Sequence, residues 1–168
     1  TKLYSLRPEG RKVIVSAWAL HDSGKMGIDE EILNKSGQLT EEEYIVMKSH
    51  TLIGASMLAR LDHYRDEELA RTAYQICRWH HERYDGGGYP DGLKGEEIPI
   101  AAQVVSIADA YDALISPRVY KEGFSHEQAM QMIRNGECGA FNPLLIECLE
   151  DSQSRIRYLA SMTAERFS

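Results

Sequence analysis

The segment AYQICRWHHERYDGGGYPDG, residues 73–92, decides the fold of this chain. Ala73, Ile76 and His80 continue, at helical spacing, a row that begins at Leu69 and that we expect to be buried, and His81 lies on the neighbouring row. Glycine and proline residues then end the helix and begin a loop. The segment therefore predicts a helix that ends in two adjacent metal-coordinating side chains, followed by a loop with unusual backbone freedom.

The remainder of the chain also has helical periodicity, and no alternating run indicates a β-strand. Two capping boxes, Thr40 with Glu43 and Ser125 with Gln128, mark the starts of two helices. We expect helices over about 8–20, 40–61, 66 to the glycine-rich loop, 100–116, 125–136 and from 142, with a further helix or tail over 152–168. The prediction is an all-α bundle of about six or seven helices with a Gly-rich loop, in a single domain that covers residues 1–168.

Composition narrows the function. The 168 residues are 43% hydrophobic, with no run long enough for a membrane span and no signal-peptide pattern, so we expect a cytoplasmic protein without membrane insertion. The net charge of −7 argues against binding to extended nucleic acid, which requires many contacts from Lys and Arg to phosphate. Three cysteines without paired spacing predict neither disulfides nor a zinc–cysteine site.

Histidines and aspartates occupy positions where a helical core would carry apolar residues. His50 follows the spacing of Val46, Ile53 and Met57, which we interpret as a buried row. The doublet His21-Asp22 ends the first helix. Asp109 and Asp112 lie on the helix that follows Pro99.

Each of these residues alone has a structural explanation, because a single histidine in a core is usually hydrogen-bonded rather than a ligand. Together they are harder to explain, since several ionisable groups buried side by side are costly unless a cation compensates them. A pair of divalent metals held by nitrogen and oxygen ligands would do so, and helical bundles commonly build such sites from facing helices. His63 and His126 lie in polar surroundings, and we expect both to be solvated.

The ordered set of motifs resembles the HD-GYP domain, a branch of the HD phosphohydrolases. The resemblance rests on HDSGK at 21–25, His50, HHERYDGGGYPDGLKGEEIP at 80–99 and ADAYDAL at 108–114, and it covers about residues 12–149. It implies a bacterial signalling enzyme, a phosphodiesterase that hydrolyses cyclic di-GMP to pGpG and then GMP. It also implies two divalent metals, iron or manganese first and zinc, nickel or cobalt as alternatives.

The resemblance also implies roles for individual residues. His21, Asp22 and Asp109 would hold one metal, and Asp22, His50, His80 and His81 the other, with Asp22 as the bridge. Lys25 would contact the scissile phosphate, so Asp22 and Lys25 are the expected catalytic residues. The expected substrate-binding residues are Lys25, Gly88, Tyr89, Arg118 and Lys121. The Gly88-Tyr89-Pro90 loop is also the expected contact for a GGDEF-type or other signalling domain.

The N-terminal end departs from the family pattern. Active members carry an upstream helix with a histidine for the first metal and, where three metals bind, a glutamate for the third, whereas residues 1–20 contain no histidine. We expect the chain to be a fragment that lacks this helix and an upstream receiver or sensor domain; alternatively the first metal is weak or absent. Two other functions stay open: a catalytically impaired module that binds a cyclic dinucleotide or a signalling partner, and an enzyme for 3′3′-cGAMP.

Overall fold

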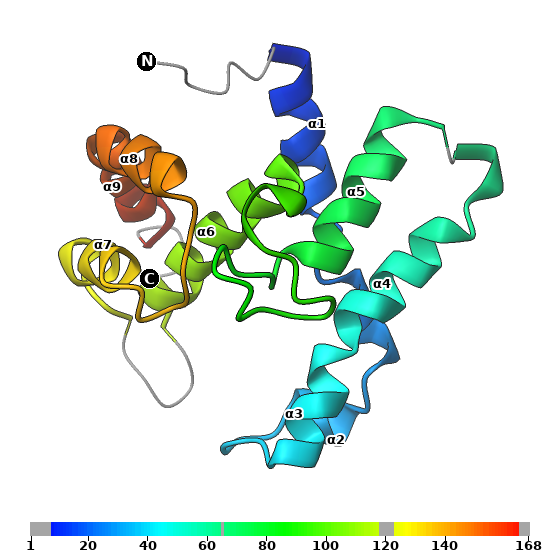
Figure 1. Ribbon diagram of the computed structural model, residues 1–168. Helices are drawn as coiled ribbons and strands as arrows, with labels where there is room; N and C mark the ends of the chain where they lie inside the picture. The colour runs from blue at the N-terminus through cyan, green and yellow to red at the C-terminus, as the bar shows by residue number, and fades with distance from the viewer. Residues whose placement is uncertain (1–7, 65, 118–122, 165–168) are drawn as a thin grey trace. The chain divides into compact units, whose positions relative to one another are not determined.

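The structure is a computed structural model that describes residues 8–64, 66–117 and 123–164 (Figure 1). In those ranges every regular element is a helix, with nine α-helices and three short 3-10 helices. The predicted all-α class is therefore confirmed. The chain divides into two compact units, residues 1–106 and 107–168, and α6 (Ile100–Ile115) contributes to both. Among the described helices, none combines the length and hydropathy needed to cross a membrane.

The first unit places its helices around the segment that carries the histidine doublet. Its elements are α1 (Pro8–Trp18), η1 (Ser23–Gly27), α2 (Glu30–Leu33), α3 (Glu41–Lys48), α4 (His50–Ala59), η2 (Asp62–Tyr64), α5 (Glu68–Trp79), η3 (Gly95–Glu97) and the start of α6. Ile14 and Ala17 of α1 pack with Ala73 and Ile76 of α5 and with Val105 of α6 in one buried cluster. The row predicted for α5 is thus buried from Ala73 to the doublet, but Leu69, its first member, is 43% exposed, so the prediction is wrong at that position.

The predicted helix over 40–61 is two helices, α3 and α4, that meet at Ser49. The Ser49 hydroxyl donates to the Val46 carbonyl oxygen at 2.6 Å, a local bond that competes with regular helix geometry. The two helices consequently do not share one buried face. His50 is 1% exposed as predicted, but Val46 and Met57 are 40% and 41% exposed, so the buried row inferred from their spacing is wrong at those two positions.

The second unit has an apolar core of its own. It contains the end of α6 together with α7 (His126–Arg134), α8 (Pro143–Asp151) and α9 (Gln153–Ala164). Ile107 and Tyr111 pack with Met130, Ile133 and Phe141. The predicted helix starts are confirmed by a capping box at Ser125 and by the Asn142 side chain, which accepts from the Leu144 N–H at 3.0 Å.

His63 and His126, which were predicted to have no role in the site, differ in their exposure to solvent. His63 is exposed, as predicted. His126 is half-buried rather than solvated: its Nδ1 lies 2.8 Å from the Tyr111 hydroxyl, and its Nε2 is buried with no hydrogen-bond partner among the described residues. The prediction failed because Tyr111, fifteen residues earlier, covers the ring, a contact that helical spacing does not reveal.

Candidate metal centre

Three imidazoles meet where α4 begins and α5 ends. His50 is the first residue of α4, His80 caps the end of α5, and His81 follows it. One nitrogen from each ring can be chosen so that all three lie within 4.8 Å of one another. This separation is small enough for one metal ion to contact all three rings.

Backbone carbonyls fix the orientation of two of these rings. His50 Nδ1 lies 2.7 Å from the Met47 carbonyl oxygen, and His80 Nδ1 lies 2.8 Å from the Ile76 carbonyl oxygen. A carbonyl can only accept, so we assign the ring proton to Nδ1 in both residues, which leaves Nε2 with a free lone pair in the neutral ring. The two Nε2 atoms face each other at 3.5 Å.

The Asp22 carboxylate lies between these imidazoles and a third one. Its Oδ1 is 3.5 Å from His50 Nε2 and 3.9 Å from His80 Nε2, while its Oδ2 is 3.3 Å from His21 Nε2. Oδ2 also accepts from the Lys25 ammonium at 2.6 Å. The two oxygens of one carboxylate thus face different nitrogen atoms, as those of a bridging ligand would.

Glycine makes this approach possible. A Cβ atom on Gly24 of η1 would lie 1.9 Å from the His50 carbonyl oxygen and 2.5 Å from the Gly54 backbone nitrogen. Any larger residue would therefore separate η1 from α4. Close contact between η1 and the first turn of α4 sets the distance from Asp22 to His50.

A buried carboxylate organises the loop after the doublet. Glu82 is 2% exposed, and its side chain accepts from the backbone N–H groups of Asp91, Gly92 and Leu93 at 2.7, 3.0 and 3.1 Å. Asp91 in turn forms a two-bond ion pair with Arg78, at 2.8 and 2.9 Å. The far side of the loop is therefore tied to the end of α5 at two points.

The loop brings Tyr89 against the cluster. The Tyr89 ring stacks on His81 with centroids 4.8 Å apart and planes inclined by 26°. Gly88 lies directly on the chain below, because a Cβ there would be 2.4 Å from both the Arg83 nitrogen and the Glu82 Cα. Of the predicted substrate-binding residues, Tyr89 thus lies against an imidazole, Gly88 holds the loop close to the chain after the doublet, and Lys25 contacts Asp22.

The electrostatics favour neutral imidazoles and an ionised carboxylate. Burial lowers the pKa of His50, and burial together with the charges of His80 and His50 lowers the pKa of His81 to about 2. Burial pulls the pKa of Asp22 upward, but the neighbouring His21 and Lys25 outweigh burial and hold that pKa well below its usual range. At neutral pH these groups are in the states that ligate metals.

The donor set fits a divalent cation. His50 and His80 direct lone pairs at each other and at the Asp22 Oδ1, with no hydrogen between them in the neutral state. Such facing acceptors repel one another in a buried site, and a cation bound between them would remove the repulsion. Nitrogen and oxygen ligands without thiolate suit iron, manganese or zinc.

Asp109, Arg118 and Lys121 are the other residues predicted for the site. Asp109 is half-buried on α6 in the second unit, and Asp112 on the same helix is exposed. Arg118 and Lys121 lie outside the described residues. The roles predicted for Asp109, Arg118 and Lys121 stay predictions.

Sequence reasoning missed Glu82. Its position directly after His80 and His81 could have indicated a role, because a carboxylate next to two buried histidines needs hydrogen-bond donors around it. Its partners lie nine to eleven residues later in an irregular loop, where periodicity gives no guidance.

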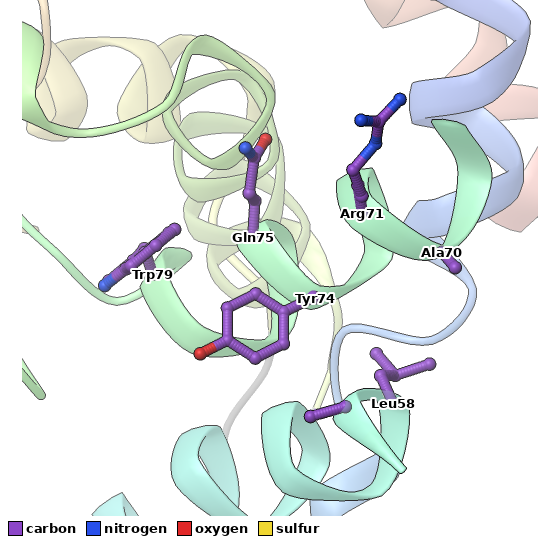
Figure 2. A pocket seen from close by; sticks show the side chains of 7 residues that line it. Leu58, Ala70, Arg71, Tyr74, Gln75 and Trp79 are labelled. Atoms are coloured by element: carbon purple, nitrogen blue, oxygen red, sulfur yellow. The ribbon is translucent and has the colours of Figure 1, made fainter. Parts of the chain in front are cut away.

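A pocket between α4 and α5 is separate from the cluster (Figure 2). Figure 2 shows Leu58 of α4 and Tyr74, Gln75 and Trp79 of α5 lining it. It contains none of the residues predicted for the metal or substrate. Trp79 links it indirectly to the loop, since its indole N–H donates to Asp91 at 2.7 Å.

Comparison with known proteins agrees with this geometry. Residues 4–142 match the HD domain family. The chain belongs to the HD domain family. HD domains are a metal-dependent family, and the histidine cluster described above could hold a metal. The HD-GYP resemblance read from the sequence is confirmed.

Several curated relatives of this HD domain carry enzyme names. The chain is 43% identical over 84% of its length to a cyclic di-GMP phosphodiesterase from Vibrio cholerae, covering 29% of that protein. It is 38% identical over 92% of its length to the cyclic di-GMP phosphodiesterase response regulator RpfG from Xanthomonas campestris, covering 40%. It is 37% identical over 88% of its length to the 3′3′-cGAMP-specific phosphodiesterase 2 from Vibrio cholerae, covering 27%. The chain thus spans less than half the length of each.

Proposed function

We propose that residues 1–168 form one HD-GYP domain that acts as a metal-dependent phosphodiesterase on cyclic di-GMP. The observation that carries the proposal is the Asp22 carboxylate, which faces His50 and His80 with one oxygen and His21 and Lys25 with the other. The relatives named as cyclic di-GMP phosphodiesterases support the choice of substrate.

Two divalent metals, iron or manganese by preference, would use Asp22 as their common ligand. His50, His80 and His81 would complete one site, and His21 and Asp109 would contribute to the other. When bound, such metals lower the pKa of a water molecule and neutralise charge that develops on the phosphate. The lowered pKa values of His50 and His81 support this role, since both rings are neutral and ready to coordinate at neutral pH.

The chain's own side chains bind and orient the substrate. Lys25 places an ammonium 2.6 Å from the Asp22 carboxylate, so a phosphate held beside Asp22 lies within its reach. Charge-assisted hydrogen bonds from lysine to phosphate oxygens are among the stronger ones in proteins. Tyr89 offers a ring for the substrate at the edge of the cluster, and Arg118 and Lys121 would hold its phosphates.

The reaction adds one water molecule to one phosphodiester bond. Oxygen from water forms the new bond to phosphorus, the P–O bond to the ribose oxygen breaks, and that oxygen takes up a proton. The ring opens to pGpG, and a second hydrolysis gives two GMP molecules. The domain would act in cytoplasmic second-messenger signalling, and contact with a GGDEF-type domain through the loop around Tyr89 belongs to the same proposal.

Two alternatives stay open. The cGAMP-specific relative favours 3′3′-cGAMP as a second substrate. The other alternative is an impaired module that binds a nucleotide or a signalling partner without cleaving it.

The deciding experiment measures metal content and hydrolysis on the same preparations. The protein is stripped with chelator and reloaded with Mn²⁺ or Fe²⁺ under anaerobic conditions. It is then incubated with cyclic di-GMP or 3′3′-cGAMP, and products are separated by chromatography. Metal-dependent formation of pGpG or GMP supports the proposal, and a preference for cGAMP selects the second substrate. A metal-loaded protein that binds cyclic di-GMP without cleaving it contradicts the enzyme and supports the module.

A further inference from the structure

A second lysine lies next to the Tyr89 ring. Lys48 is the last residue of α3, two positions before His50, and its side chain is half-buried. Its ammonium lies 5.7 Å from the centroid of the Tyr89 ring and 5.0 Å from that of Tyr44. Tyr89 itself stacks on His81, so one aromatic ring separates Lys48 from the histidine cluster.

The surroundings of Lys48 differ from those of two other lysines in the first unit. Lys25 pairs with Asp22, and Lys35 pairs with Glu43. In the described part of the chain, the contacts of the Lys48 ammonium are with aromatic rings rather than with carboxylates. An aromatic face attracts a cation without carrying a neutralising charge. The rings therefore hold the ammonium in place and leave its charge available to an anion.

We propose that Lys48 binds the phosphate of the cyclic dinucleotide that is not being hydrolysed. The inference rests on the proposed function, and it adds a residue to the same site. A cyclic dinucleotide carries two phosphates, and Lys25 at Asp22 is placed for the one that is cleaved. In a chain with a net charge of −7, an ammonium that pairs with no carboxylate among the described residues and lies beside Tyr89 is a suitable partner for the other phosphate.

Tyr44 extends this subsite outward. Its ring is 48% exposed and flanks the ammonium on α3, one helical turn before Lys48. Together Lys48, Tyr44 and Tyr89 form a cation–aromatic wall that presents one positive charge and two ring surfaces. Such a wall fits a phosphate joined to nucleoside rings better than it fits a free inorganic ion.

The test compares Lys48→Gln with Lys48→Arg, and Lys12→Gln serves as the matched control. Lys12 is exposed on α1, and its replacement removes one positive charge without touching Tyr89. For Lys48→Gln we expect the KM for cyclic di-GMP and the Kd for pGpG to rise about tenfold or more, since a hydrogen bond to a charged group is lost. We expect kcat and metal content to stay close to wild type. Lys48→Arg should restore most of the affinity, and Lys12→Gln should change neither constant.

Salt dependence separates binding from positioning. If Lys48 contacts a phosphate, Lys48→Gln should bind pGpG with a shallower dependence on salt concentration than the wild type does. If Lys48 only holds Tyr89, Lys48→Gln should add nothing to the effect of Tyr89→Leu in the double variant, and the salt slope should stay unchanged. That second result, or an unchanged Kd in Lys48→Gln, overturns the inference.

Failure of the proposed function gives a different result. A wild-type protein that cleaves no cyclic dinucleotide removes the proposed function, whereas binding of pGpG still reports on Lys48. Thermal unfolding of each variant identifies a folding defect. If Lys48→Gln unfolds early, the comparison of Lys48→Arg with wild type decides, because an affinity lost despite the retained charge would contradict the phosphate contact.

Discussion

His50 and His80 are oriented by carbonyl groups three or four residues earlier in the chain. His81 is instead covered by Tyr89, which a loop carries back over it, and that loop is anchored through Glu82 to residues nine or more positions away. The same kind of side chain is thus fixed by short-range contacts in one region and by long-range contacts in the other. A substitution in the loop should therefore leave metal binding at His50 and His80 largely unchanged, whereas a substitution of Asp22 should weaken metal binding and activity together.

The largest effect is expected for Asp22→Asn. The substitution keeps the shape of the side chain but removes the charge that faces His50 on one side and His21 on the other. Loss of a residue that merely supports a metal ligand costs about 10- to 100-fold in metal affinity or activity, so loss of a shared ligand should exceed about 100-fold. Titration of the metal-free protein with metal, monitored by calorimetry, measures this change in affinity. Unchanged metal content with near-normal turnover would exclude the proposed bridging carboxylate.

A smaller and more local effect is expected for Gly88→Ala. The added Cβ would lie 2.4 Å from backbone atoms of Glu82 and Arg83, so the loop must move. Overpacking of this kind costs about 1–3 kcal/mol of the free energy of unfolding. We expect a lower Tm and a higher KM, with metal binding at His50 and His80 largely retained. Gly37→Ala is the matched control, since a Cβ at that position meets nothing within 4 Å.

If metal affinity falls as far in Gly88→Ala as in Asp22→Asn, the distinction between the two regions is wrong. The helix-end histidines would then depend on the loop. The control separates this outcome from a general cost of replacing a loop glycine with alanine.

Glu82→Gln tests the anchor itself. In the amide one oxygen can still accept, but the NH₂ group that replaces the other oxygen faces a backbone N–H that donates to the carboxylate in the wild type. A buried donor left without its acceptor costs about 1–3 kcal/mol. We expect faster amide hydrogen exchange at Asp91, Gly92 and Leu93 and weaker substrate binding. Unchanged exchange at those three amides would show that the loop is held mainly by the Arg78–Asp91 pair.

The sequence was informative where contacts are short-range. The capping boxes at Thr40 and Ser125 follow from residues within one helical turn, and both are present. The row that ends at His80 is buried from Ala73 onward. The break at Ser49 was missed because a serine in a helical pattern shows no sign of which carbonyl its hydroxyl will bind.

In the candidate site, too, short-range features could be predicted and long-range contacts could not. The burial of His80 could be predicted because an ionisable residue in an apolar row is conspicuous. Glu82 and Lys48 could not, since their roles depend on where the loop returns: Glu82 meets backbone amides of that loop, and Lys48 meets the Tyr89 ring.

The smallest effect concerns His126, which lies in the second unit. Burial, followed by the charge of Arg157, lowers its pKa in the folded state, although Glu127 opposes the shift. The unfolded chain then binds a proton below about pH 6.5 that the folded chain does not, so stability falls as pH decreases through that range. We expect His126→Gln to have a Tm that depends less on pH between about 7 and 5 than the wild type does. His63→Gln, at an exposed position, is the control. An equal flattening in both variants would mean that burial of the His126 ring does not cause the dependence.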